Sequence, residues 1–146
     1  MADKGYDAIE IVKYLRDWFE KGVLYFGIYT LKYAKKSGRI PSAAAFVGEL
    51  LGLRPILKIS DNQIVTDDKV RGDSAVIPAI SKKLTENIEE GSPYCVVYGN
   101  DSDLRDAMAA AATEAIGYPP ADFYQIGAAV AANSGPELAG VAFKTK

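Results

Sequence analysis

The sequence contains no histidine and a single cysteine, and both scarcities narrow the chemistry that the chain can perform. Histidine is the usual general base near neutral pH and the commonest metal ligand, so its absence argues against many catalytic and metal-dependent mechanisms. With one thiol, Cys95, the chain can form neither an internal disulfide nor a thiolate zinc cluster. Cys95 lies in the apolar run Tyr94–Tyr98, which predicts a buried and unreactive side chain.

Long hydrophobic runs and dense basic runs are also lacking. No apolar segment reaches the roughly 18 residues that a membrane span needs, and no secretory leader pattern follows Met1. The net charge is −2 and basic residues are dispersed, whereas nucleic acid binding requires a concentrated cationic face. With 49% hydrophobic and 25% charged residues, the composition is typical of a globular protein. We therefore expect residues 1–146 to form one cytoplasmic domain, with no membrane span and no nucleic acid partner.

The amino-terminal part of the chain predicts a helix, a strand and a shorter helix. Residues 6–20 have an amphipathic helical pattern, with Asp7 as a suitable N-cap. The apolar stripe of this helix consists of Ile9, Val12, Leu15 and Phe19. Strand-forming residues follow at 23–29, and a short helix is expected at 31–36, closed by Gly38.

A third helix and a hairpin are expected next. Pro41 suits the first turn of a helix that would run to Gly52. The inward residues of this helix would be Phe46, Val47, Leu50 and Leu51. Residues 53–60 and 63–71 are expected to pair as a hairpin, because the Asp61-Asn62 step between them has suitable turn chemistry.

The second half alternates helix and strand again. One helix is capped by Asp73 or Ser74 and ends at Gly91, and the next is capped by Asp101 or Ser102. Their apolar stripes are Ile77, Ile80, Leu84 and Ile88, and Leu104, Met108 and Ile116. Strands are expected at residues 94–99, 123–127 and 140–145. Since hairpin and crossover connections both occur, the pattern predicts a two-layer α/β domain with a mixed sheet of about six strands and helices mainly on one face.

Several short segments carry a resemblance to a known family. They are TLKYAKKSGRI at 30–40, KVRG at 69–72, NSGP at 133–136 followed by Gly140, and RPIL at 54–57 with QIV at 63–65. In this order and at these distances they resemble the DegV family of fatty-acid-binding proteins. Together they span nearly the whole chain.

The resemblance implies that the chain corresponds to the carboxy-terminal lipid-binding domain of a larger two-domain protein. The missing amino-terminal domain would supply half of the site for the carboxylate head group. Family members hold a long-chain fatty acid with its carboxylate between the domains and its tail in an apolar tunnel. Some present that carboxylate to a separate fatty acid kinase subunit. The chain would thus be a non-catalytic component, with a fatty acid as ligand and neither cofactor nor metal.

The resemblance places the head group at Arg39, Asn133, Ser134 and Gly135. The guanidinium of Arg39 can hold a carboxylate through two parallel hydrogen bonds, although a solvated arginine at a helix end is the alternative. Asn133 stands where the family usually has histidine, and an amide can donate a hydrogen bond but cannot titrate. Ser134 and Gly135 add a hydroxyl and a backbone N–H, or simply belong to a turn. Glu137 replaces a family glycine and would repel a neighbouring carboxylate.

The remaining candidates are apolar walls and a docking surface. The tail-lining candidates are Phe46, Val47, Leu50, Ile126 and Val130, each of which could equally be ordinary core. A buried methylene contributes about 0.8 kcal/mol, so a tail of about sixteen carbons could gain on the order of 10 kcal/mol. By resemblance, Arg71 would dock the kinase subunit with Lys69 beside it; the alternative is an ordinary surface arginine.

Two other functions remain open from the sequence. A phosphotransferase domain would lack histidine and any G-x-x-x-x-G-K-[ST] phosphate loop. Its magnesium ligands would have to come from aspartates that sit in predicted turns, namely Asp61, Asp67, Asp68, Asp101 and Asp103. A protein-interaction domain with a lost or altered ligand would fit the departures at Asn133 and Glu137.

Overall fold

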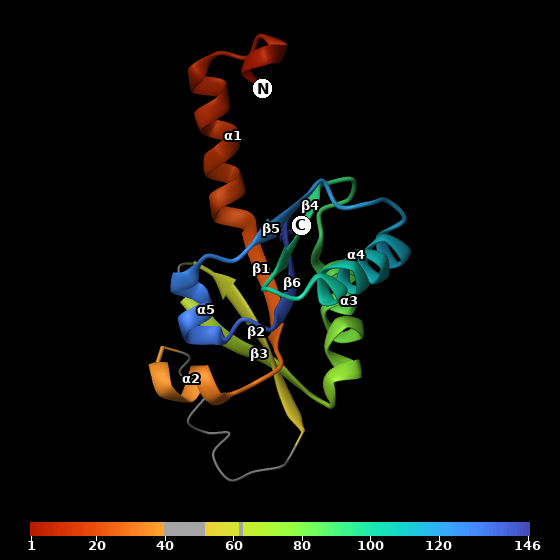
Figure 1. The fold of residues 1–146 in the computed structure, drawn as a ribbon. Helices are drawn as coiled ribbons and strands as arrows, with labels where there is room; N and C mark the ends of the chain where they lie inside the picture. The colour runs from red at the N-terminus through yellow and green to blue at the C-terminus, as the bar shows by residue number, and fades with distance from the viewer. Residues whose placement is uncertain (40–51, 62) are drawn as a thin grey trace.

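The computed structural model describes residues 1–39, 52–61 and 63–146, and within these residues six strands form one mixed sheet (Figure 1). The strands are β1 (Gly22–Ile28), β2 (Leu53–Ser60), β3 (Gln63–Arg71), β4 (Tyr94–Tyr98), β5 (Asp122–Gln125) and β6 (Leu138–Lys144). Their order across the sheet is β3-β2-β1-β6-β4-β5. Only the β4–β5 pair in this part of the chain is parallel, and the other neighbours are antiparallel. The expected α/β class with a mixed sheet is confirmed.

The two longest body helices cover one face of the sheet. They are α3 (Val76–Asn87) and α4 (Ser102–Ile116). Successive strand residues point to opposite faces, so Val23 and Tyr25 of β1 share this face. They pack there with Ile80 of α3 and Met108 of α4 in the larger core cluster. This arrangement agrees with the expectation that helices lie mainly on one side.

Two short helices lie at the opposite face. They are α2 (Lys32–Ser37) and α5 (Ala128–Ser134), which contact each other. Phe26 and Ile28, the intervening residues of β1, point to this side and pack with Ala34 of α2 in a second core cluster. The sheet is therefore partly covered on both faces, and the short helices leave room for a pocket.

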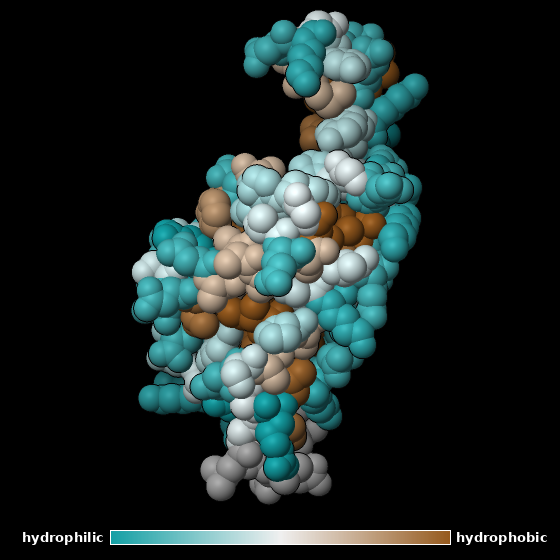
Figure 2. All heavy atoms as spheres, turned by 90° about the vertical axis from the view of Figure 1, so that its right-hand side faces the viewer, coloured by the Kyte–Doolittle hydropathy of each residue, from teal (hydrophilic) through white to brown (hydrophobic). Residues whose placement is uncertain are grey.

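The first helix, α1 (Ala8–Lys21), stands away from the body (Figure 1). Asp7 caps it through a complete capping box with Glu10, as the sequence predicts. Its apolar stripe is not buried, because Ile9 is 69% and Phe19 is 83% exposed. At its base, Lys144 of β6 pairs with Asp17 at 2.6 Å. Figure 2, from the side of α3 and α4, also shows the amino-terminal part rising clear of the body.

Most strand boundaries match the sequence patterns, but several helix boundaries differ. The hairpin pairs as expected, with Asp61 in a left-handed conformation at φ 51°. In contrast, α3 begins only after a 3-10 turn at Asp73–Ala75 and ends at Asn87, so neither predicted cap applies and Gly91 lies beyond it. The expected helix after Pro41 lies outside the described residues.

Cys95 is less buried than its apolar surroundings predict. Its side chain lies at the junction of β4 with the edge strand β5 and is partly exposed, so the expectation of full burial is wrong. Desolvation, helped by the Asp122 carboxylate, nevertheless raises the pKa of the Cys95 thiol. A raised pKa keeps the side chain in its less reactive thiol form.

Among the described residues, no helix has the length and apolar character to cross a membrane.

Candidate functional site

An apolar slot of about 400 Å³ opens on the face of the sheet that carries α2 and α5. Its floor is formed by Phe26 of β1, Ile59 of β2 and Ile64 of β3. Ile59 and Ile64 are direct cross-strand partners, so their side chains share this face. The described residues that line the slot are Phe26, Arg39, Ile59, Ile64, Ala129, Val130, Asn133 and Ser134. The slot therefore combines an apolar floor with a polar margin.

The packing of α2 against α5 brings Arg39 and Asn133 to the same slot. Gly38 ends α2 in a left-handed conformation at φ 64°, and Arg39 follows it with its N–H donating to Ser37 Oγ at 3.2 Å. On the other side, Gly135 ends α5 at φ 88° and lies against Tyr33 of α2. Two residues that are 94 positions apart in the sequence, Arg39 and Asn133, thus line the same pocket.

The polar groups of α5 are largely engaged within the helix. Asn133 Nδ2 donates to the Ala129 carbonyl at 2.7 Å, and Ser134 Oγ donates to the Val130 carbonyl at 3.0 Å. The Gly135 N–H donates to the Ala131 carbonyl at 2.8 Å. The expectation of a free N–H at Gly135 is therefore wrong, because residues 133 and 134 belong to a helix and not to a turn.

Arg39 supplies the positive charge of the slot. Among the described lining residues it alone is charged, and no described carboxylate forms an ion pair with it. Lys32 and Lys36 of α2 line a neighbouring pocket of about 570 Å³. This margin should raise the local concentration of anions. The chemistry that the site can perform is capture of an anion with an apolar body, since the described lining holds no nucleophile and base in contact.

A second apolar pocket of about 440 Å³ lies at the base of α1. Leu15, Trp18 and Phe19 of α1 form one side of it, and Leu24 and Ile59 belong to the sheet face of the slot. Ile59 therefore lines both spaces. Together the two pockets form a continuous apolar surface on this face of the sheet, which extends from Arg39 past Ile59 to α1.

The structure separates the predicted tail-lining residues. Val130 lines the slot, whereas Ile126 packs against the second core cluster. Phe46, Val47 and Leu50 lie outside the described residues. Sequence reasoning missed Phe26, Ile59 and Ile64, although the alternation of the hairpin strands could have placed Ile59 and Ile64 on one face. Glu137, the expected source of repulsion, is exposed and is not among the described lining residues.

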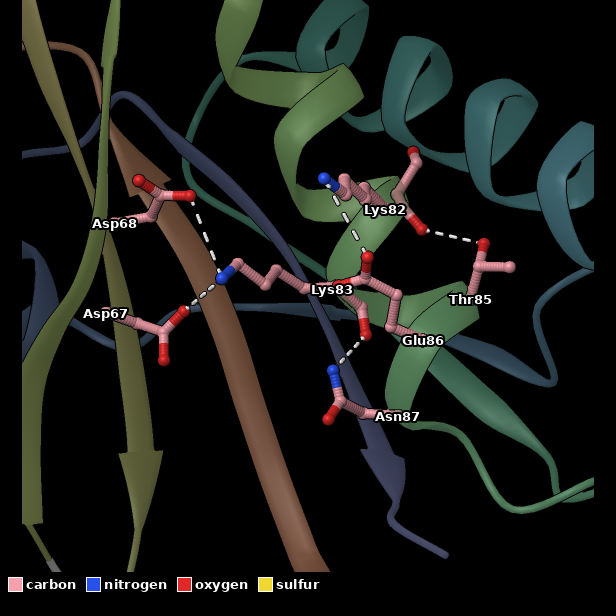
Figure 3. Close-up of polar contacts among 8 residues, drawn as sticks. Asp67, Asp68, Lys82, Lys83, Thr85, Glu86 and Asn87 are labelled. Atoms are coloured by element: carbon pink, nitrogen blue, oxygen red, sulfur yellow. Dashed lines mark hydrogen bonds and ion pairs between the residues drawn. The ribbon is translucent and has the colours of Figure 1, made fainter.

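The predicted docking residues, Lys69 and Arg71, lie on the edge strand β3, separated by one residue. Beside them, a bulge between Ile56 and Leu57 of β2 disturbs the register of β3. Asp67 and Asp68 both point to Lys83 of α3, at 2.7 and 3.7 Å (Figure 3).

Three of the aspartates weighed as magnesium ligands, Asp67, Asp68 and Asp101, have side-chain partners within the chain. Hydrogen bonding to Asp67 raises the pKa of Lys83, so this ion pair fixes α3 to β3. Asp101 caps α4 by accepting from the Asp103 and Leu104 N–H groups. Among the residues that the structure describes, no group of three or more potential metal ligands converges.

The fold and the slot define an α/β domain that can hold an amphipathic anion, and comparisons with known proteins give the family. The family model described as "Uncharacterised protein, DegV family" matches residues 1–146. The chain belongs to the DegV family. The DegV domain-containing protein SA0704 of Staphylococcus aureus (strain N315) is 31% identical over 109 residues, which are 75% of this chain and 38% of that protein.

Two solved structures illustrate the similarity of the fold. A DegV family protein from Thermus thermophilus, described by its fatty acid binding, is 26% identical with a TM-score of 0.75 over 98% of this chain and 52% of its own. A stearic acid-binding protein from Eubacterium ventriosum is 22% identical with a TM-score of 0.82 over 97% of this chain and 50% of its own. The chain therefore spans about half the length of these proteins.

Proposed function

We propose that this chain binds a long-chain fatty acid, with the acyl tail over the apolar floor of the slot and the carboxylate at Arg39. The observation that carries this function is the slot itself, in which Phe26, Ile59 and Ile64 lie beneath an arginine that no carboxylate of the described residues pairs with. Solved relatives described as fatty-acid-binding proteins support the same ligand class. Holding the acyl tail and holding the carboxylate require no catalysis by this chain, so we regard it as a binding protein.

The tail should supply most of the binding free energy. Each buried methylene contributes about 0.8 kcal/mol, whereas a hydrogen bond to a charged group contributes about 1.5–3 kcal/mol net. The slot of about 400 Å³ falls within the range of small-molecule sites, roughly 300–1,000 Å³. Because Ile59 also lines the pocket at α1, the far end of a long tail could continue there.

At the head-group end, Arg39 has the leading role. The carboxyl end of α5 carries partial negative charge, which disfavours an anion unless a cation compensates it. Arg39 offers that cation, and the second hydrogen on Asn133 Nδ2 can donate to the same carboxylate. We assign Ser134 and Gly135 to the head-group margin as shaping residues, because their donors already have partners.

The solved relatives are about twice the length of this chain, which supports a larger assembly. We propose that an amino-terminal domain completes the head-group site, as the family resemblance implies, and that it also covers the exposed apolar stripe of α1. A cytoplasmic fatty acid kinase subunit would receive the exposed carboxylate, with Arg71 and Lys69 on β3 as its docking residues. Loss of kinase binding on Arg71→Ala, with lipid binding intact, would support this arrangement; unchanged kinase binding would count against it.

The direct test is recovery and titration of ligand. Protein purified from cell extract and then denatured should release fatty acid detectable by mass spectrometry. After delipidation, Arg39→Ala should weaken binding of palmitate about tenfold, since one charge-assisted contact is lost. Arg16→Ala, an exposed arginine on α1, is the matched control and should bind like the parent chain. Absence of lipid together with no measurable titration would contradict the function.

Two observations favour a second candidate, a protein-interaction domain. The donors of Ser134 and Gly135 are satisfied within α5, and the stripe of α1 is exposed. In that case a partner protein would bind equally well to delipidated chain and to the Arg39→Ala variant.

A further inference from the structure

The slot and the pocket at the base of α1 meet at one row of side chains that crosses the sheet. Ile64 of β3, Ile59 of β2 and Leu24 of β1 are successive cross-strand partners on the slot face. Ile64 lines the slot, Leu24 lines the pocket at α1, and Ile59 lines both. Side chains directly opposite each other on antiparallel strands have Cβ atoms about 4.5–5.5 Å apart, so the apolar row is continuous from one space to the other.

Two neighbouring rows of this sheet face differ in burial. Leu57 and Phe26 are cross-strand partners on the side of the row away from α1, and they are 0% and 4% exposed. Ile59 and Leu24, two residues nearer to α1 on the same strands, are only partly buried. The open apolar surface of β1 and β2 therefore lies at Ile59 and Leu24, where the two spaces meet.

The pocket at α1 suits the end of an acyl tail and does not suit a head group. Its described lining residues carry no charge; they are Leu15, Trp18, Phe19, Gly22, Val23, Leu24, Ile59, Ala142 and Phe143. The indole N–H of Trp18 already donates to the Tyr14 hydroxyl at 2.9 Å. A carboxylate would lose its hydration there without a partner, whereas a methyl end loses nothing. The arginine that can hold a carboxylate, Arg39, lines the slot.

We propose that the acyl tail passes over Ile59 and ends in the pocket at α1, so that Ile59 determines which tail lengths bind. This inference rests on the proposed fatty acid site and adds a preference for long tails. A short tail occupies the slot of about 400 Å³ alone, whereas a long tail also enters the pocket of about 440 Å³. Isoleucine is branched at Cβ and restricted at χ1, so it holds the height of this crossing fixed.

Competition binding of laurate, myristate, palmitate and stearate to the delipidated chain tests the crossing. These ligands share one head group, so their comparison isolates the tail. Affinity for the parent chain should rise about fourfold with each methylene that becomes buried beyond Ile59. Ile59→Trp narrows the crossing and should lower the ratio of stearate to laurate affinity about tenfold or more, as if roughly two methylenes were left exposed.

The control for Ile59→Trp is the same substitution on the opposite face of the hairpin. Val65 follows Ile64 on β3, so its side chain points away from the slot, and it is 42% exposed. Val65→Trp should keep the stearate-to-laurate ratio of the parent.

A second variant probes the far wall without disturbing the core. Phe19 lines the pocket at α1 and is 83% exposed, so Phe19→Ala should fold like the parent. It should lower the stearate-to-laurate ratio about threefold, the equivalent of roughly one buried methylene. Ile9 lies on the same helix, is 69% exposed and lines neither pocket, so Ile9→Ala is the control and should keep the ratio.

The outcomes separate this inference from the proposed function. If Ile59→Trp weakens laurate and stearate by the same factor, or if Phe19→Ala keeps the ratio of the parent, the tail does not pass Ile59 and the inference is overturned. Equal affinity of the parent chain for all four fatty acids overturns it as well, while the fatty acid site stands. If the parent chain binds none of them, the proposed function fails and the inference fails with it.

Discussion

Tyr33 of α2 lies so close to Gly135 that a Cβ at position 135 would come within 2.9 Å of its Cδ2 atom. The backbone of Gly135, with φ 88° and ψ 162°, occupies a region that is essentially restricted to glycine. This close approach joins α2 to α5, and the two helices hold Arg39 and Asn133 at the same slot.

Alanine at position 135 should therefore destabilise the protein and displace the Arg39 margin. Backbone strain and the collision with Tyr33 together should cost about 2–3 kcal/mol of unfolding free energy, read from the urea midpoint. Gly127→Ala is the control, because Gly127 precedes α5 with φ −74° and has open space at its Cβ. We expect it to cost about 1 kcal/mol at most, as a weaker N-cap. Equal costs for the two variants would contradict the role of Gly135.

The hairpin and several caps could be predicted from sequence because each rests on local chemistry. Alternation fixed residues 53–60 and 63–71 as strands, and Asp7 caps α1 as its position indicates. The expected turn at 133–136 begins inside α5, because tertiary packing on α2 outweighs the local turn preference of Asn133 and Ser134.

The site was harder to predict than the fold. Arg39 and Asn133 came from a family resemblance. The floor joins Ile59 and Ile64 of the hairpin to Phe26 of β1, and no local pattern specifies the register between β1 and β2. For α1, in contrast, the helix was predicted from the sequence but the exposure of its apolar stripe was not. Its spacing is typical of a buried face, but periodicity does not say which surface covers a helix.

Lys83 should stabilise the junction of α3 with β3, because the β3 bulge directs two carboxylates to it (Figure 3). Its side chain and that of Asp67 are 22% and 24% exposed, so solvent screening is partial. Lys83→Met should reduce the unfolding free energy by about 1 kcal/mol, less so in high salt.

The neighbouring residue offers a matched control for Lys83. Lys82 is 73% exposed and lies 3.8 Å from Glu86 (Figure 3). Lys82→Met should change the unfolding free energy by less than about 0.5 kcal/mol. If Lys82→Met lowered the unfolding free energy more than Lys83→Met, the contacts of Lys83 with the two carboxylates at the bulge would not stabilise the fold.

Tyr29 should make the protein sensitive to alkali. Its hydroxyl is buried without a hydrogen-bond partner in the described structure, and desolvation raises the pKa of Tyr29 to about 12. The unfolded chain loses this proton near pH 10, whereas the folded chain retains it. Stability is thus complete below about pH 10 and falls as the pH rises toward 12.

Tyr29→Phe should flatten this alkaline loss and leave stability at pH 7 unchanged or higher by about 1 kcal/mol, because it removes an unsatisfied hydroxyl. Urea unfolding at about pH 7, 10 and 11.5, which brackets the pKa shift of Tyr29, checks the slope of the unfolding free energy against pH. Tyr6→Phe, on an exposed side chain before α1, should retain the slope of the parent. An identical alkaline slope in both variants would remove Tyr29 as its source.

The most direct measurement is photolabelling of the delipidated chain with a palmitate analogue that carries a diazirine at the end of its tail, followed by peptide mapping. Binding in the slot predicts labels on floor or wall residues such as Phe26, Ile59 and Val130, with competition by unlabelled palmitate. Labels confined to Ile9 and Val12 of α1, which line neither pocket, or labels that palmitate does not displace, would contradict a fatty acid site in this domain.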